Sequence, residues 1–301
     1  MEMESVIIGA KKYQFISHYQ KNDILREKFN ALTKKTYGFD FEKWYKSGYW
    51  GKPSVLYSLL DEGTMVSHVT ASTIHFNVLG EMKKYIQFGT VMTDPLYQKR
   101  GLVQFLIRKI IQENEDNCDL FYLFANDNVL DFYPKFGFKK ACEYSASIRV
   151  TERNTQHAVR RLHMENPNDR NLLYYSARCA KVLSQCAMYK NAGLVLFYCY
   201  CFGLYNLYYI KNLKVIAVAE YTADTLILYD IFSLKGATID DVIAALSHEN
   251  TKKAVLLFTP IDLERYTLHP FKEENATLFI RSKKGNPFDD HKLIFPLLSH
   301  T

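Results

Sequence analysis

A short basic stretch, QKRG at residues 98–101, stands between an apolar run and a run with helical periodicity. Leu102, Leu106 and Ile110 recur at i, i+4 and i+8, which predicts a helix that begins just after the glycine. The first amides of a helix have no partner within the helix and carry a partial positive charge, so they attract phosphate. We therefore expect the backbone amides of residues 99–104 to hold an anionic group, with the glycine allowing close approach.

A second stretch, ANDNVLDFYPKFGF at residues 125–138, follows the next apolar run. Its Tyr133 carries a phenol that can donate a proton, and its Gly137 is typical of a helix end. Taken singly, the tyrosine fits a half-buried core residue and the glycine an ordinary cap. It is the spacing between these two residues and the basic turn that makes the pair informative about function.

Together the two stretches resemble the GNAT superfamily of N-acetyltransferases over about residues 1–150. The cofactor loop of that family reads Gln/Arg-x-x-Gly-x-Gly/Ala after a strand that ends in Val and Pro. The matching residues here are Val91, Pro95, Gln98 and Gly101, whereas Val103 stands where Gly or Ala is usual. The later motif of the family has an Asn, an aromatic-Tyr pair and Gly-Phe, and the matching residues are Asn126, Phe132-Tyr133 and Gly137-Phe138.

The resemblance implies that acetyl-CoA binds, as co-substrate and without a metal, between two parallel strands that splay apart, 88–93 and 119–125. The pantetheine arm would pair with the backbone of Val91–Thr93, and the pyrophosphate would lie on residues 99–104. The residues expected to bind the cofactor are Val91, Met92, Thr93, Gln98, Lys99, Arg100, Gly101, Leu102, Val103, Gln104 and Asn126.

The resemblance also implies direct transfer of the acetyl group to a primary amine of a small molecule or peptide. Tyr133 would be the general acid that protonates the leaving thiolate. The attacking amine must be neutral, so a base is needed, and the region before the loop offers no acid. The candidates for this base are Glu81, His68, His75 and the terminal carboxylate of Thr301, and the sequence favours none of them.

The surrounding patterns predict an α/β fold with two GNAT-like domains, 1–150 and 170–301, each a mixed central sheet flanked by helices. In the first half the expected elements are strands at 13–19, 53–63, 65–76, 83–93 and 118–125 and helices at 23–38, 40–50, 102–114 and 128–137. Residues 151–170 show almost no apolar periodicity and are interpreted as the connection between the domains. In the second half we expect helices at 171–187, 238–249 and 261–266, with strands between and after them.

The second domain is interpreted as a degenerate relative of the first. Its segment LYDIFSLKGATIDDVIAAL lacks the cofactor loop, and Asp240 and Asp241 at its helix start would repel phosphate. We expect no cofactor there. The domain would have a structural role, or its tyrosines would line the acceptor pocket.

The composition of the chain limits which partners and which cellular location we expect for the protein. The net charge of +6 is divided evenly between the two halves, which argues against a nucleic-acid partner. The cysteines show no zinc-ligand spacing, and the acidic start is unlike a signal peptide, so we expect a cytoplasmic protein with reduced thiols that is compatible with a homo-oligomer. The uncharged segment Ala192–Ile210 has the length of a membrane span, but its aromatic and β-branched residues favour strands, so no membrane partner is expected.

Two other functions stay open. Val103 and the missing base are compatible with a non-catalytic acyl-CoA-binding or interaction protein. A transferase with another donor, such as an aminoacyl-tRNA, is disfavoured by the lack of a concentrated basic patch.

Overall fold

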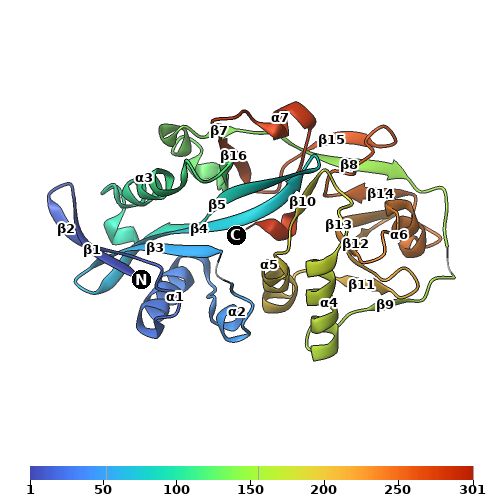
Figure 1. The fold of residues 1–301 in the computed structure, drawn as a ribbon, viewed down its shortest axis with the longest axis horizontal. Coiled ribbons are helices and arrows are strands. Elements are labelled where there is room, and N and C mark those ends of the chain that lie inside the picture. Colours follow the sequence, from blue (N-terminus) through green and yellow to red (C-terminus); the bar gives the residue numbers. More distant parts are fainter. Residues whose placement is uncertain (52, 155, 301) are drawn as a thin grey trace.

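The computed structural model describes residues 1–51, 53–154 and 156–300, and it contains two mixed sheets that lie side by side (Figure 1). The expected mixed α/β class is therefore confirmed. The strands of the first sheet, in spatial order, are β1 (Glu2–Ile8), β2 (Lys11–Ser17), β3 (Ser54–Asp61), β4 (Thr64–Val78), β5 (Glu81–Thr93), β6 (Leu120–Ala125), β16 (Thr277–Arg281) and β7 (Lys139–Lys140), with β10 (Cys186–Met188) paired to β4.

Helices cover both faces of the first sheet (Figure 1). On one face lie α1 (Asp23–Tyr37) and α2 (Glu42–Lys46), and on the other lies α3 (Leu102–Asn114). The apolar stripe predicted for α1 is buried, and α1 ends at Gly38, whose φ of 82° is a conformation that glycine adopts without strain. The predicted stripe of α3 is buried as well, so this helix is fixed over the strands that precede and follow it.

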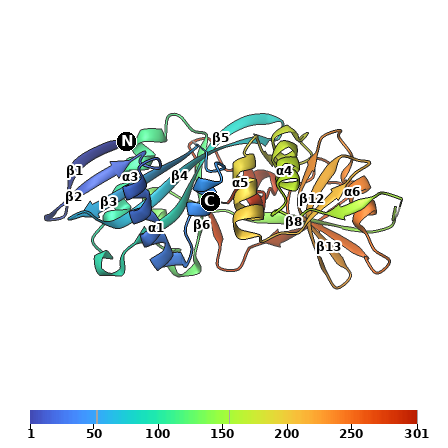
Figure 2. The ribbon, with the colours of Figure 1, turned by 90° about the horizontal axis from the view of Figure 1, so that it is seen from below.

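The second sheet is built mainly from the second half of the chain. Its strands, in spatial order, are β15 (Thr267–Phe271), β8 (Glu143–Arg149), β14 (Lys253–Leu256), β13 (Thr225–Ser233), β12 (Val215–Thr222), β11 (Leu207–Ile210) and β9 (Val159–Arg161). The helices of this half are α4 (Pro167–Cys179), α5 (Ala192–Leu196), α6 (Ile239–Leu246) and α7 (Pro287–His291). Figure 2 shows α5 at the junction between the two halves, where Leu194 packs into the core of the first and Leu196 into that of the second.

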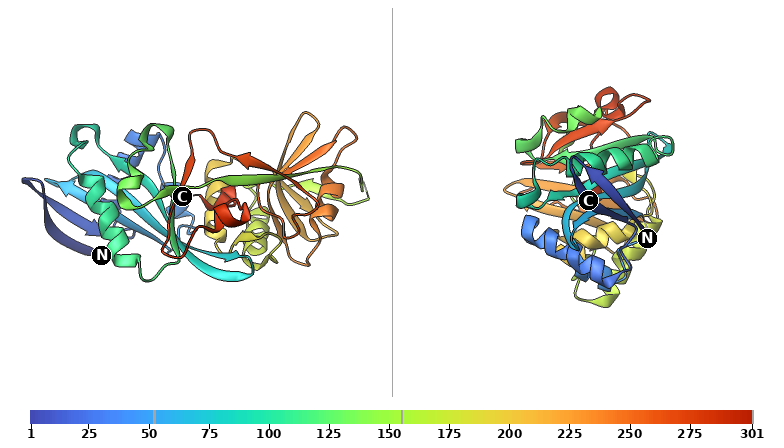
Figure 3. Two further views of the ribbon diagram at one scale, coloured as in Figure 1. Left: turned by 90° about the horizontal axis from the view of Figure 1, so that it is seen from above. Right: turned by 90° about the vertical axis from the view of Figure 1, so that its left-hand side faces the viewer.

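The two halves exchange strands. β8 lies within residues 1–150 but pairs with β14 and β15 of the second sheet. β16 lies near the other end of the chain but pairs with both β6 and β7 of the first sheet. The end of the described chain, near His300, comes back to the junction between the halves (Figure 3). A division of the chain at 1–150 and 170–301 stays a prediction.

Four expectations for the second half were wrong in part, and one of them is the helix expected at 171–187, because α4 ends at Cys179 and Cys186–Met188 form β10. Residues 192–202 are not strands: α5 is followed by a π-helical segment, Phe197–Phe202, and only β11 is extended. No helix in the described chain combines the length and the apolar character needed to cross a membrane. The predicted connection 151–170 contains β9 and the start of α4, and residues 261–266 form turns rather than a helix.

The segment 192–202 is helical rather than extended because of its packing at the junction between the two halves. Gly193 lies directly against the backbone carbonyl of Tyr49, where a β-carbon would clash, and the indole of Trp44 donates a hydrogen bond of 2.9 Å to the Gly193 carbonyl. Leu194 and Leu196 point into different cores. A helix that is apolar all round has no amphipathic period, so its sequence looks like a buried strand.

Candidate active site

The strands β5 and β6 run parallel and then separate. They are paired only from Tyr85 with Leu120 to Gln87 with Tyr122. Beyond this point β5 is bent by a bulge against β4, where Thr90 has a φ of 45°, and β6 is paired on its other side with β16. The bend therefore opens the gap between parallel strands that the sequence predicted, and it leaves the β5 backbone beyond Gln87 unpaired on the β6 side.

The turn before α3 presents its amides to this gap. Gly101, with a φ of 80°, is the residue before the helix, and in the described chain no side chain caps it. The first intrahelical bond runs from the Phe105 amide to the Gly101 carbonyl at 3.0 Å, so the amides of residues 102–104 precede the hydrogen-bonded ladder. A backbone of this shape can bind an anion without any basic side chain.

The gap and the turn belong to one cavity of about 910 Å³. Of the residues expected to bind the cofactor, the lining contains Val91, Met92, Thr93, Gln98, Lys99, Gly101, Leu102, Val103, Gln104 and Asn126. Arg100 is the exception in the described chain: its guanidinium donates to the Leu96 carbonyl at 2.8 Å and lies over the ring of Tyr97. A volume of this size fits an extended ligand that reaches from α3 to the junction of the two halves.

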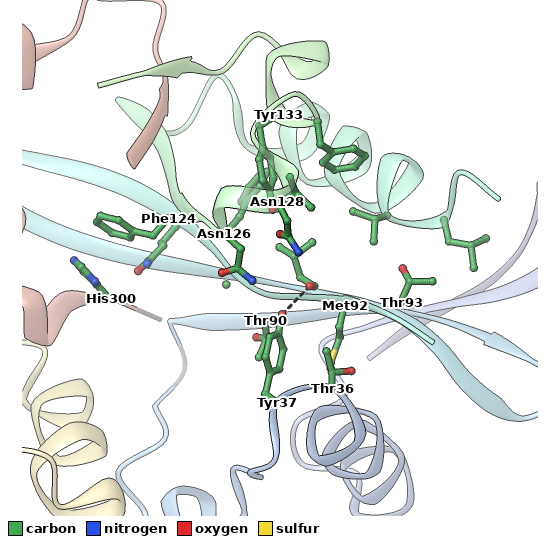
Figure 4. Close-up of a pocket in the computed structure, with 18 of the residues that line it drawn as sticks. Thr36, Tyr37, Thr90, Met92, Thr93, Phe124, Asn126, Asn128, Tyr133 and His300 are labelled. Carbon is green, nitrogen blue, oxygen red and sulfur yellow. Dashed lines mark hydrogen bonds between the residues drawn. The ribbon is translucent and has the colours of Figure 1, made fainter. Parts of the chain in front are cut away.

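Tyr133 also lines the cavity, opposite β5 (Figure 4). It begins a 3₁₀ turn, Tyr133–Phe136, and its ring packs against Phe138 and against Phe279 of β16. Burial raises the pKa of Tyr133 above its usual value, and the nearby phenol of Tyr37 adds to this effect. The hydroxyl therefore keeps its proton at neutral pH, which is the state that a proton donor needs.

Tyr37, at the end of α1, is a site residue that the sequence did not reveal. Its hydroxyl donates a hydrogen bond of 2.7 Å to the Val91 carbonyl, across the opening of the cavity (Figure 4). Burial of the hydroxyl raises the pKa of Tyr37 to about 12. A ligand that pairs with the Val91 carbonyl must displace this hydrogen bond.

The second half of the chain supplies one wall of the cavity. This wall is made of Phe197, Tyr198, Phe202, Leu204 and His300, and it faces Phe39, Phe41 and Phe124 from the first half. The ring of Phe197 stacks on Phe41 with centroids 5.4 Å apart. These wall residues were missed because residues 192–202 were interpreted as strands, and because nothing in the sequence near His300 predicts a neighbour as remote as Phe124.

Three of the four candidate bases named from the sequence do not lie in the cavity. Within the described chain, the lining includes none of Glu81, His68 and His75. Glu81 is exposed and pairs with Lys83, and His75 is exposed on β4. Thr301, whose terminal carboxylate was the fourth candidate, lies outside the described residues.

His68 is buried and fully hydrogen-bonded. Its Nδ1 lies 2.7 Å from Ser58 Oγ, and its Nε2 lies 2.8 Å from Thr70 Oγ1, which in turn contacts Thr90 Oγ1 at 2.7 Å. Burial lowers the pKa of His68 to about 3, so the imidazole is neutral. This chain of hydroxyl groups satisfies a polar side chain within the core and reaches the cavity only at Thr90.

Comparison with known proteins identifies the first half of the chain. Residues 18–141 match the family model described as acetyltransferase (GNAT) domain. No sequence among curated proteins is similar enough to this chain to count as a match.

Solved structures resemble this one over most of its length. A conserved protein from Enterococcus faecalis V583, described as a probable N-acyltransferase, has a TM-score of 0.64 at 11% identity, with 90% of this chain and 72% of that chain covered. A GCN5-related N-acetyltransferase from Kribbella flavida has a TM-score of 0.55 at 13% identity (90% and 72% covered). Another, from Anabaena variabilis, has a TM-score of 0.54 at 13% identity (89% and 72% covered). Identities this low establish a shared fold, and the family match shows that residues 18–141 are similar to a GNAT acetyltransferase domain.

Proposed function

We propose that this protein is an acetyl-CoA-dependent N-acetyltransferase that acts on a primary amine of a small molecule or peptide. The observation that carries the proposal is a single cavity that joins three features: the amides at the start of α3, the unpaired backbone of β5 and the hydroxyl of Tyr133. Each feature has a use in acyl transfer from coenzyme A, and they lie in the order in which an extended ligand would meet them.

The residues present fit acetyl-CoA. The amides of residues 102–104, with Lys99 and Gln98 beside them, would hold the pyrophosphate. The backbone of Val91–Thr93 would pair with the amide groups of the pantetheine arm, in the manner of an added strand. When bound, acetyl-CoA supplies an activated acetyl group as a thioester.

The chain itself would then orient the acceptor and move protons. The aromatic wall at the junction of the halves would hold the acceptor beyond the end of the pantetheine arm and exclude water from it. Tyr133 would give its proton to the departing thiolate, because its hydroxyl stays protonated until a strong proton acceptor forms beside it. Tyr37 would release the Val91 carbonyl when the pantetheine arm enters.

The test is to incubate the purified protein with acetyl-CoA and a panel of primary amines, and to measure free thiol and acetylated amine together. We expect equal amounts of thiol and acetyl-amine with at least one acceptor. Binding of acetyl-CoA without release of thiol for any amine would contradict the proposal. That result would favour the non-catalytic acyl-CoA-binding function, with which Val103 in the loop is also compatible.

A further inference from the structure

His300 belongs to the wall of the cavity, and its imidazole has so far been given no part in proton transfer. It follows the 3₁₀ turn Leu297–Ser299, and its ring stacks on Phe124 with centroids 3.7 Å apart and planes 27° apart. Figure 4 shows the two rings together at the end of the cavity remote from Thr93. His300 therefore lies on the side where the acceptor would enter, beyond the residues that would hold the cofactor.

The two ring nitrogens of His300 have different environments. Nδ1 lies 3.2 Å from Oε2 of Glu273, which belongs to the turn between β15 and β16. Nε2 is buried and has no hydrogen-bond partner among the described residues. The hydrogen bond from His300 lowers the pKa of Glu273, so its carboxylate is ionised and favours the tautomer of the imidazole that carries a proton on Nδ1. The lone pair of Nε2 is then left to accept a proton.

The position of His300 is fixed by its surroundings. The hydroxyl of Tyr198, from the π-helical segment, donates a hydrogen bond of 2.6 Å to the His300 carbonyl. The preceding Ser299 is buried, and its hydroxyl donates to the Pro296 carbonyl at 2.6 Å. The imidazole is thus held by both halves of the chain: by Phe124 of β6 on one side and by Tyr198 and Glu273 on the other.

A comparison with His68 shows why His300 is the better candidate for a base. Both nitrogens of His68 already have hydroxyl partners, no carboxylate contacts it, and it lies outside the cavity. A proton could pass from the cavity to His68 only through Thr90 and Thr70. The ring of His300 is itself part of the lining, but its Nε2 is covered, so this nitrogen must be exposed to the cavity before it can take a proton.

We propose that His300, oriented by Glu273, is the general base that deprotonates the acceptor amine. This inference rests on the proposed acetyltransferase function. Nε2 takes one proton from the acceptor ammonium, which leaves a neutral amine with a free lone pair. The nitrogen forms a bond to the acetyl carbon and the carbon–sulfur bond breaks. The thiolate takes a proton from Tyr133, and the second proton of the attacking nitrogen restores that phenol. The imidazolium then releases its proton to solvent, so one proton is released for each amide formed.

The experiment compares two classes of acceptor. An alkylamine is protonated at pH 7 and needs the base, whereas an aryl hydrazine is already neutral and does not need deprotonation before attack. For His300→Ala we expect kcat with the alkylamine to fall roughly 10²–10⁴-fold, the usual contribution of a general base, and the rate with the hydrazine to change far less. Added imidazole should restore part of the alkylamine rate by entering the space left by the ring. The affinity for CoA should stay the same.

Two further variants sharpen the test. Glu273→Gln should lower the alkylamine rate less than His300→Ala, because it removes the charge that orients the ring but leaves the imidazole. His291→Asn changes an exposed histidine of α7 in the same part of the chain and should leave both rates unchanged. Melting temperatures of all variants show whether each one is folded.

Four outcomes would overturn the proposal. If His300→Ala slows both acceptors equally and imidazole restores nothing, the residue has a structural role. If Thr90→Val selectively slows the alkylamine while His300→Ala does not, the proton passes through His68 instead. If the wild type releases thiol with neither acceptor class, the acetyltransferase function fails and the role of His300 fails with it. If the wild type is active and His300→Ala has the wild-type rate with both acceptors, only the role of His300 as a base is ruled out.

Discussion

The two sheets contain the same local unit, and among the described residues the first of the two units opens onto the cavity of about 910 Å³. In the first, β5 is followed by α3 and then by β6, which returns parallel to β5; in the second, β13 is followed by α6 and then by β14, which returns parallel to β13. Each first strand also has a bulge against its antiparallel neighbour, between His68 and Thr70 of β4 and between Val218 and Ala219 of β12. The order of elements is shared, and one difference between the two units is how each helix begins.

The start of α6 is closed by its own side chains. Thr238 accepts from the Asp241 amide at 3.1 Å, and the Asp241 carboxylate accepts from the Thr238 amide at 2.9 Å, which completes a capping box. Ser233 Oγ accepts from the amides of Gly236 and Ala237 at 3.1 and 3.0 Å. The start of α3 has no side-chain cap in the described chain. The fold therefore contains two helix starts that could bind an anion, and capping residues already occupy the amides at the start of α6.

The largest expected difference between the two units is that the first binds CoA and the second does not. We predict one CoA per chain, because the amides before α6 already have partners and Asp240 and Asp241 add negative charge there. Isothermal titration calorimetry of the whole chain with CoA measures this stoichiometry. Saturation at two molecules per chain would show that the capping box does not exclude the ligand.

The next largest effect concerns the tyrosines that follow each unit. Tyr133→Phe keeps the ring that packs on Phe279 but removes the hydroxyl, so kcat should fall roughly 10²–10⁴-fold while CoA affinity stays the same. Tyr266→Phe, in the partly buried tyrosine after β14, is the matched control and should leave kcat unchanged. A Tyr133→Phe variant with the wild-type rate would make that residue structural.

A charge introduced at the start of α3 should have a smaller effect. Gly101→Glu places a carboxylate beside the amides that would hold the pyrophosphate, and we expect CoA affinity to fall roughly 10–100-fold, about 1.4–2.7 kcal/mol. Gly101→Ala is the control for the backbone, because any side chain at a φ of 80° is strained, although a β-carbon there would make only ordinary contacts with Ile8 and Gln104. Equal affinity for the Glu and Ala variants would place the pyrophosphate elsewhere.

The smallest effect is on stability. Thr238→Ala removes the cap of α6 and should lower the free energy of unfolding by about 1 kcal/mol, with no change in CoA affinity. Urea denaturation of the variant and the wild type measures this difference. An increase in CoA binding by the variant would mean that the capping box alone keeps the second unit closed.

The parts of the site that lie close together in sequence could be predicted from it. The turn before α3 and the end of the stretch from Asn126 to Gly137 have a local chemistry that determines their shape, because glycine permits the positive φ at Gly101 and Gly137. The helix expected at 128–137 was wrong in part, because this stretch forms two 3₁₀ turns, Asp127–Val129 and Tyr133–Phe136. Periodicity located α1 and α3 for the same reason: each helix buries one stripe against one sheet.

The parts that depend on remote contacts could not be predicted. A strand after residue 266 was expected, but the place of β16 between β6 and β7 depends on partners from the other half of the chain. His300 has no local pattern, since Phe124 and Glu273 reach it only after folding. Residues 192–202 have the composition of a strand and become helical because two cores bury them.

Because β16 comes late in the chain, the cavity can be completed only late in folding. β6 lies between β5 and β16, and until residues 277–281 have been synthesised and have docked, β6 has an unpaired edge. Tyr133 lacks the support of Phe279 for the same period. Pairing between segments so far apart in the chain is slow to form. The segment that carries the GNAT motifs leaves the ribosome early, but its cleft is completed only when the last strand arrives, so a fragment that ends near residue 150 would expose β6 to aggregation.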